Sequence, residues 1–186
     1  SLALELDRSA TGLLADYPGQ TFPADVAAAW RAILGADRVL GTDHRPLAQR
    51  GLRGFVGDLA PELGLPPYAW FGEDVPERTE VRGSANAWLL THAPWLWPET
   101  AQLWYATHVR EFGHSSFWLS GFREYAQSSR DPMSDIDSGP VIAGLGTSAT
   151  AFGLGVARLM GDEARARPIA LEMIAASWPL PNGRLL

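Results

Sequence analysis

Apolar residues recur at helical spacing through most of the chain, and loops rich in Pro, Gly and acidic residues separate the helical stretches. A first helix is predicted over residues 23–40. Pro23 suits a first helical turn, Asp25 favours the positive end of a helix, and Gly41 ends it. A second helix, predicted over residues 42–63, follows a short turn, so the two form an antiparallel pair.

The same arrangement recurs twice further along the chain. The helices predicted for these two pairs span residues 84–96 with 97–111, and 141–160 with 163–177. The segments that connect the pairs, residues 65–81 and 113–140, show no sustained period and are predicted to be loops. Strand signals are almost absent, and only residues 117–125 are expected to pair as a short extended piece.

These elements predict an all-α domain of antiparallel helical hairpins, arranged as an α/α toroid or part of one. Turns within the hairpins then fall at one end of the array, and the long loops between hairpins fall at the other. Long loops inside a compact domain are usually functional. We therefore expect Asp25, Arg82, Arg123 and Asp137 to approach one another at the loop end. A full toroid usually holds more hairpins, so a homo-oligomer or a missing N-terminal region could complete the ring.

Composition narrows the classes of function. The chain of 186 residues is nearly half hydrophobic and about a fifth charged, which fits a single globular domain. Its net charge of −6 argues against nucleic-acid binding, which needs a concentrated basic face. All 15 basic residues are Arg, a bias typical of GC-rich bacterial genomes. Because Cys is absent and the four His are scattered, neither a metal nor another cofactor is expected.

The chain is expected to be the C-terminal part of a longer protein, because it opens at Ser1 without a Met or a signal peptide. No stretch of the sequence is long and apolar enough to cross a membrane. An anchor or signal upstream of the chain would make the domain membrane-anchored or extracytoplasmic. Without one it would be cytoplasmic, and the sequence leaves both locations open.

The densest polar cluster precedes the helix predicted over residues 141–160. Asp135 and Asp137 share one side of an extended loop and lie near a helix N-terminus, whose N–H groups stabilise anions. Two close carboxylates in a partly dry cleft repel each other, so one can keep its proton and serve as an acid. Equally, both could cap the helix and fix the loop, because Asp is common before helices.

Further polar and aromatic residues are expected at the same end. In an enzyme, Asp135 or Asp137 would be the general acid, and Asp25 or Glu124 the general base. The residues assigned to substrate binding are Arg82, Arg123, Tyr125, Tyr17 and Trp88. A cavity lined in this way suits a polyhydroxyl substrate. The alternative is a solvated network of salt bridges on a helical scaffold.

Small residues share one face of the helix predicted over residues 141–160, among them Gly144, Gly146, Gly153 and Gly155. A Gly inside a helix costs about 1 kcal/mol relative to Ala. Close approach of another helix or of a ligand would offset that cost, and close helix packing is the expected cause.

Four motifs spread over most of the chain resemble a bacterial α/α-toroid family that includes linalool dehydratase/isomerase-like proteins. They are residues 17–25 (YPGQTFPAD), Arg82-Gly83-Ser84, Arg123-Glu124-Tyr125, and residues 135–140 (DIDSGP). The resemblance implies an α/α barrel with a polar cavity, often extracytoplasmic behind an N-terminal membrane segment. Enzymes of the linalool type are associated with cysteines in the cavity, and this chain has none. The resemblance therefore leaves open acid/base catalysis by carboxylates and Tyr, without the cysteine chemistry.

Two functions of different classes follow. The first is an enzyme, a lyase, isomerase or glycoside-active protein that acts on a small-molecule or carbohydrate-like ligand by general acid/base catalysis. Carboxylates from separate loops within roughly 5–10 Å of each other would support it. The second is a non-catalytic helical domain that binds a partner or assembles into a larger ring. It predicts an exposed apolar face on a terminal hairpin.

Overall fold

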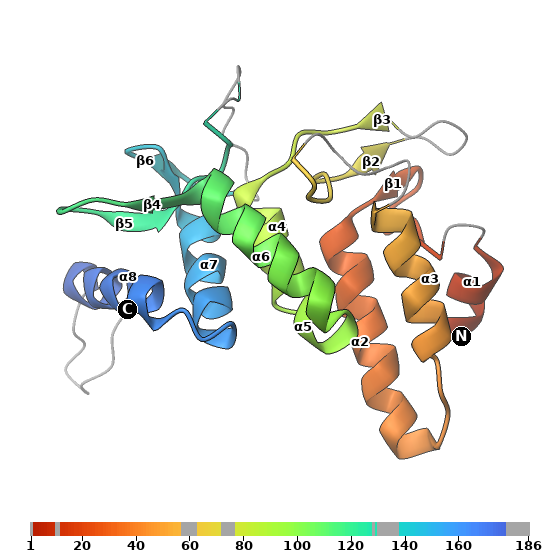
Figure 1. Cartoon of the computed structure of the whole chain (residues 1–186). Coiled ribbons are helices and arrows are strands. Elements are labelled where there is room, and N and C mark those ends of the chain that lie inside the picture. The colour runs from red at the N-terminus through yellow and green to blue at the C-terminus, as the bar shows by residue number, and fades with distance from the viewer. Residues whose placement is uncertain are drawn as a thin grey trace.

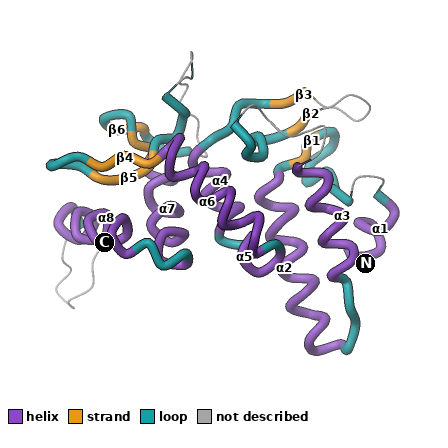
Figure 2. Tube along the Cα trace, viewed as in Figure 1, coloured by secondary structure: helices purple, strands orange, loops and turns teal. Residues whose placement is uncertain are grey.

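A computed structural model describes residues 2–9, 12–56, 63–71, 77–127, 129 and 138–177 of the chain. The protein is mostly helical, as predicted (Figure 1; Figure 2). The helices are α1 (Leu2–Arg8), α2 (Pro23–Leu40), α3 (Arg45–Val56), α4 (Gly83–Leu90), α5 (Ala93–Leu96), α6 (Pro98–Phe112), α7 (Thr147–Leu159) and α8 (Glu163–Ala176). The short strands are β1 (Gln20–Thr21), β2 (Trp70–Phe71), β3 (Glu77–Arg78), β4 (Gly113–Ser115), β5 (Ser120–Phe122), β6 (Val141–Ile142) and β7 (Leu145–Gly146).

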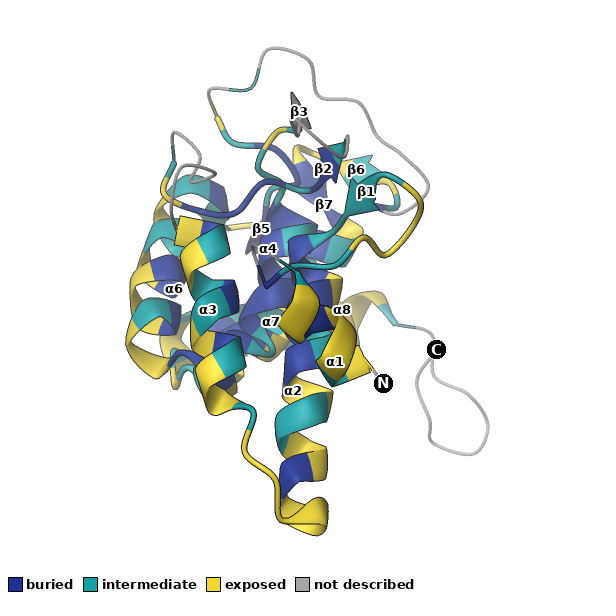
Figure 3. Ribbon diagram, turned by 90° about the vertical axis from the view of Figure 1, so that its right-hand side faces the viewer, coloured by how far each residue is buried: buried dark blue, intermediate teal, exposed yellow. Residues whose placement is uncertain are grey.

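Helix α4 lies at the centre of the described part of the chain and contacts α2, α5, α6 and α7. Most of its residues are buried (Figure 3). Its glycine start permits a close approach, because a Cβ on Gly83 would overlap the backbone carbonyl oxygen of Arg123. A helix therefore occupies the middle of the described array. The α/α toroid, in which helices surround a central cavity, stays a prediction.

Aromatic rings join α3 to the α5–α6 region and to β2. The Phe55 ring stacks on Trp70 with centroids 5.9 Å apart, and it meets the Trp97 and Trp104 rings edge to face at 5.5 and 6.5 Å. The Trp97 indole N–H donates to the carbonyl of Ala48 at 3.0 Å, so its polar atom is satisfied inside the core. Each fully buried ring contributes about 1.5–3 kcal/mol to folding, so this cluster anchors α3.

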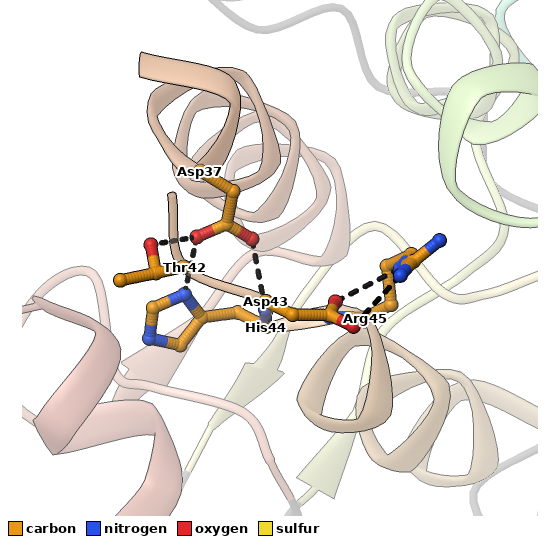
Figure 4. Close-up of polar contacts among 5 residues, drawn as sticks. All are labelled: Asp37, Thr42, Asp43, His44 and Arg45. Carbon is orange, nitrogen blue, oxygen red and sulfur yellow. Dashed lines mark hydrogen bonds and ion pairs between the residues drawn. The ribbon is translucent and has the colours of Figure 1, made fainter. Parts of the chain in front are cut away.

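The helix predicted over residues 23–40 is confirmed as α2. It ends at Gly41, whose φ of 68° lies in the left-handed region that glycine favours. Helix α3 begins at Arg45, later than predicted, because hydrogen bonds to the Asp37 side chain hold the intervening residues in a turn (Figure 4). The part of the second predicted helix over residues 57–62 lies outside the described residues.

The prediction of one helix over residues 84–96 is wrong in one respect, because a turn at Thr91 divides this segment into α4 and α5. Pro94 lies in the first turn of α5 and has no N–H with which to continue the hydrogen-bond ladder of α4. The Thr91 hydroxyl donates to the Trp88 carbonyl at 2.7 Å and closes the end of α4. Helix α6 agrees with its predicted position within a residue.

The third predicted pair is wrong at its start. Residues 141–146 form the antiparallel hairpin β6–β7, and α7 begins only at Thr147. The two residues of the turn, Ala143 and Gly144, have φ values of 51° and 81°, as a tight two-residue hairpin turn requires. Ala rarely adopts a positive φ, so Ala143 gives no signal for a turn. The local sequence therefore predicts a helix here. Helix α8 lies where predicted, and the Asp162 side chain caps its N-terminus.

One glycine on the small face of α7 is closely packed, against a strand rather than against the helix that was expected. A Cβ on Gly153 would overlap the ring of Phe122, so the absence of a side chain lets α7 lie against β5. Gly155 faces open space. Gly144 and Gly146 belong to the β6–β7 hairpin, so the prediction that they lie in a helix is wrong.

The short strands are mostly elements that the hydrophobic pattern misses. Residues 65–81, predicted to be a loop, contain β2 and β3, which pair antiparallel with each other and place β2 beside β1. Strands of two residues are too short to show an alternating pattern. The extended piece predicted over residues 117–125 is confirmed by β5, which pairs antiparallel with β4.

Candidate functional site

Helices α2, α4 and α7 begin at the same end of the molecule (Figure 1). Their first two turns, with the segments around Tyr17 and Tyr68, surround a pocket of about 280 Å³ that we call the aromatic pocket. The pocket is lined by Tyr17, Phe22, Ala24, Asp25, Tyr68, Ser84, Ala85, Trp88 and Phe152. Three of the residues predicted for the site, Tyr17, Asp25 and Trp88, therefore line one pocket.

A turn before α2 positions the first aromatic wall. Gly19, with a φ of 69°, reverses the chain, and the carboxylate of Asp16 accepts a hydrogen bond from the Phe22 N–H at 2.7 Å. The Phe22 ring then meets the Tyr17 ring edge to face at 5.9 Å and the Tyr68 ring at 5.3 Å. These contacts hold the three rings together although they come from two distant segments.

Helices α4 and α7 supply the second wall. The rings of Trp88 and Phe152 lie 5.1 Å apart at a tilt of 44°. Ser84 and Ala85, one turn earlier on α4, line the pocket with small side chains and leave its volume open. The pocket thus places one carboxylate, one serine hydroxyl and two tyrosines among apolar side chains, and an apolar lining with a few polar groups is the usual composition of a small-molecule site.

The charged residue in the described lining of the pocket is acidic. Asp25 lies in the first turn of α2 and is exposed. The pKa of the neighbouring Asp16 carboxyl is raised, first by its partial removal from water and also by the negative charge of Asp25, although the Phe22 N–H opposes the shift. None of the described residues that line the pocket is basic. Sequence reasoning missed Asp16, whose only signal is its place just before the Tyr17 motif.

Glu124 lies behind the pocket rather than in its lining. Its side chain is fully buried, and Oε1 accepts a hydrogen bond from the Ser84 hydroxyl at 2.6 Å while Oε2 accepts one from the Ser84 N–H at 3.2 Å. Its backbone carbonyl accepts the Gly83 N–H at 2.8 Å. Glu124 therefore caps the N-terminus of α4. As a base it would reach a ligand only through Ser84.

Arg82 lies beside the pocket wall. Its guanidinium carbon is 4.2 Å from the centre of the Tyr68 ring and 5.6 Å from that of Tyr125. The backbones of Arg82 and Tyr125 also form an isolated antiparallel bridge. Such a stacked cation fixes the Tyr68 ring that lines the pocket. Arg82 and Tyr125 therefore support the pocket from outside its described lining.

Arg123 is engaged away from the pocket. Its guanidinium donates to the carbonyl of Gly113 at 2.9 Å and contacts Nδ1 of His114 at 2.9 Å. These bonds join Arg123, directly after β5, to β4. The backbone of Arg123 is close to Gly83, but its side chain does not line the aromatic pocket. The predicted acids Asp135 and Asp137 lie outside the described residues.

A second polar cluster occupies the turn between α2 and α3, at the far end of α2 from the pocket (Figure 4). The Asp37 carboxylate accepts the Thr42 hydroxyl at 2.6 Å and contacts Nδ1 of His44 at 2.6 Å. The Thr42 hydroxyl is the main reason that the pKa of Asp37 is lowered, with smaller contributions from His44. Arg45 bonds Asp43 through two nitrogens at 2.8 Å and lowers the pKa of Asp43 to about 2.

An aspartate–histidine pair can orient a general base, as in catalytic triads. A hollow of about 420 Å³ lies beside it, between α1 and the turn. Its described lining holds Asp7, Asp43 and His44 with apolar residues, and it contains no hydroxyl or thiol that His44 could activate. The cluster is therefore interpreted as a brace for the turn.

Within the described residues, no three His, Asp or Glu side chains gather as metal ligands. None of the helices there combines the length and the hydropathy that crossing a membrane requires. Sequence reasoning also missed Phe22, Tyr68 and Phe152 as pocket residues. The first two are aromatic residues beside predicted loops, which was an available signal, whereas Phe152 in mid-helix gave none.

The sequence matches no protein-family model, and no curated protein is significantly similar to it. The resemblance to linalool dehydratase/isomerase-like proteins therefore stays a prediction. The geometry of the aromatic pocket is the basis for assigning a function.

Proposed function

We propose that the aromatic pocket binds a small hydroxylated, carbohydrate-like ligand and that Asp25 acts on it as a general acid or base. The observation that carries this proposal is the pocket lining, in which five aromatic rings surround one carboxylate and one serine hydroxyl. Rings present flat apolar surfaces to a sugar-like ring, and the few polar groups fix its orientation.

The size of the pocket limits the ligand. A volume of about 280 Å³ is at the lower end of the range of roughly 300–1,000 Å³ for small-molecule sites. It suits a single ring or a short polyol rather than an oligosaccharide or a nucleotide. The carboxylate of Asp25 in the lining, with the neighbouring Asp16, disfavours phosphorylated and other anionic ligands.

Asp25 is the one predicted catalytic carboxylate among the described residues that line the pocket. In a lyase, isomerase or glycoside-active enzyme it would accept or donate the proton at a ligand hydroxyl. Ser84 would accept a hydrogen bond from a second ligand hydroxyl, because its own hydroxyl donates to Glu124 and is thereby fixed in direction. Asp135 or Asp137 would supply the second carboxylate that such chemistry requires.

Binding can be tested by titrating the protein with a panel of monosaccharides, their methyl glycosides and alditols, and following backbone amide NMR shifts of Ala24, Ser84 and Ala85. At least one compound should shift these three amides together. The Asp25→Asn variant should weaken that binding about tenfold, the effect of losing one hydrogen bond of about 1.5 kcal/mol to a charged group.

Glu99→Gln is the matched control, because Glu99 is also an exposed acid in the first turn of a helix but lies on α6, away from the pocket. It should bind as the wild type does. The proposal fails if no compound shifts the pocket amides, or if Glu99→Gln weakens binding as much as Asp25→Asn. Hydrolysis or isomerisation of the bound compound, lost in Asp25→Asn, would establish the catalytic part.

A second candidate is a helical assembly domain, including part of a larger α/α ring. It is favoured by the exposed apolar side chains of α8, where Leu171 and Ile174 are each 56 % exposed. Exposed apolar surface on a terminal helix is typical of an interface. The two functions are compatible, since the aromatic pocket and α8 are formed by different residues.

A further inference from the structure

The tip of the β4–β5 hairpin exposes two large aromatic side chains. Phe117 is 88 % exposed and Trp118 is 84 % exposed, and their rings meet edge to face at 4.6 Å. The tip is held in one shape, because the Ser116 N–H donates to the Leu119 carbonyl at 3.0 Å and the Ser116 hydroxyl accepts the Leu119 N–H at 3.1 Å. The hairpin projects from the body of the molecule (Figure 1).

An apolar groove begins beside the tip of the same hairpin, at Leu119 and Ser120. It has a volume of about 320 Å³ and lies between β5, the β6–β7 hairpin, α7 and α8. Its lining includes Leu119, Ser120, Ile142, Ile169, Glu172 and Met173. Ile142 is 61 % and Met173 42 % exposed, so no described side chain covers them.

We propose that the Phe117–Trp118 tip of one chain inserts into this groove of a second copy, and that the second copy's tip fills the groove of the first. The groove lining is mainly apolar, and one oxygen of its carboxylate, Glu172, accepts the Ser120 N–H at 2.9 Å. Residues 115–120, which form the tip, carry no charge. Insertion therefore brings no charge from the tip into the groove, and the Glu172 carboxylate keeps its bond to the Ser120 N–H.

The arrangement closes as a symmetric dimer. Leu119 joins the tip to the groove, so both features lie on one side of the chain and a two-fold axis between them can engage both at once. An aromatic side chain buries about 150–250 Å². The four rings of a pair would thus bury about 600–1,000 Å², and with the equal groove surface that they cover about 1,200–2,000 Å², which is the size of a stable interface.

A membrane surface is the competing occupant for exposed aromatic residues. It is disfavoured, because it gives no role to the groove and because the chain carries a net charge of −6, which anionic lipids repel. The two occupants predict different behaviour in solution.

Sedimentation velocity over micromolar to sub-millimolar concentrations tests the proposal. The wild type should dimerise, and Trp118→Ser should weaken dimerisation at least about 30-fold, as loss of an interface hot spot does. Met173→Glu, which places a charge in the groove, should have the same effect. Trp118 and Met173 are both exposed, so neither change should disturb folding, which circular dichroism verifies.

Two controls match these variants. Trp95→Ser removes another exposed tryptophan, which is 56 % exposed on α5, and Leu159→Glu places the same charge on α7 outside the groove, at a side chain that is 42 % exposed like Met173. Both should dimerise like the wild type. A wild type that stays monomeric throughout overturns the proposal, as do controls that dissociate as readily as the test variants. A monomer that floats with phosphatidylcholine–phosphatidylserine vesicles and loses this binding in Trp118→Ser also overturns it.

Discussion

Mild acid should destabilise this protein through His108, a histidine on α6 that lies wholly inside the core. Its imidazole is stacked between the rings of Phe112 and Phe122, at centroid distances of 5.3 and 5.0 Å. Neither ring nitrogen has a hydrogen-bond partner among the described residues. Burial, assisted by the positive charge of Arg165, lowers the pKa of His108 to about 3. The residue is therefore neutral in the folded protein.

The magnitude follows from the difference between the folded and unfolded pKa values. In the unfolded chain the pKa of a histidine is about 6.5, so between pH 6.5 and 3 the unfolded state binds a proton that the folded state does not. Stability is full above pH 6.5 and decreases as the pH falls towards 3. At pH 5 the loss is about 2 kcal/mol, because 1.5 pH units below the unfolded pKa correspond to about 1.36 kcal/mol each.

Urea denaturation at pH 8 and pH 5, on the wild type and on His108→Phe, isolates this contribution. Phe keeps a planar ring between Phe112 and Phe122 and cannot titrate. Other groups contribute equally to both proteins, so the decrease in free energy of unfolding from pH 8 to pH 5 should be about 2 kcal/mol smaller in the variant. The same decrease in both proteins would refute the reasoning, because it would mean that His108 does not have a lowered pKa in the fold.

Two other predictions concern packing and the α2–α3 turn. Gly153→Ala should destabilise the protein by about 1–3 kcal/mol in thermal or urea denaturation, because its methyl group overlaps the Phe122 ring. Gly155→Ala on the same helix faces open space and should stabilise by about 0.4–1 kcal/mol; equal effects would contradict the packing. Asp37→Asn should lower the melting temperature at pH 7, because it weakens the bonds from Thr42 and His44. The difference from the wild type should begin to decrease as the pH falls below about 4, the unfolded pKa, and should vanish below the lowered pKa of Asp37 in the fold, because the carboxylate stabilises the fold only while it is ionised. A difference that persists in acid would contradict this origin.

The ends of most helices could be predicted from the sequence, because local groups decide them. Pro23 and Gly41 bound α2 through their own backbone preferences, and Asp162 caps α8 through a bond to the N–H of a residue three positions on. The gathering of Tyr17, Asp25 and Trp88 in one pocket also followed from the sequence, since the alternation of short turns and long loops sends the starts of α2 and α4 to one end.

Tertiary contacts decided what the local sequence could not. Ala143 adopts a positive φ because β6 and β7 pair across it, and that pairing outweighs the helical pattern of the following residues. Glu124 is held behind Ser84, which is distant in the sequence, and Arg123 is held at Gly113, so two residues of one polar motif face different surroundings. A sequence motif shows which groups are present. The free-energy cost of burying a carboxylate or guanidinium must be offset by a hydrogen-bonding partner, and only the packed chain determines which partner is close enough.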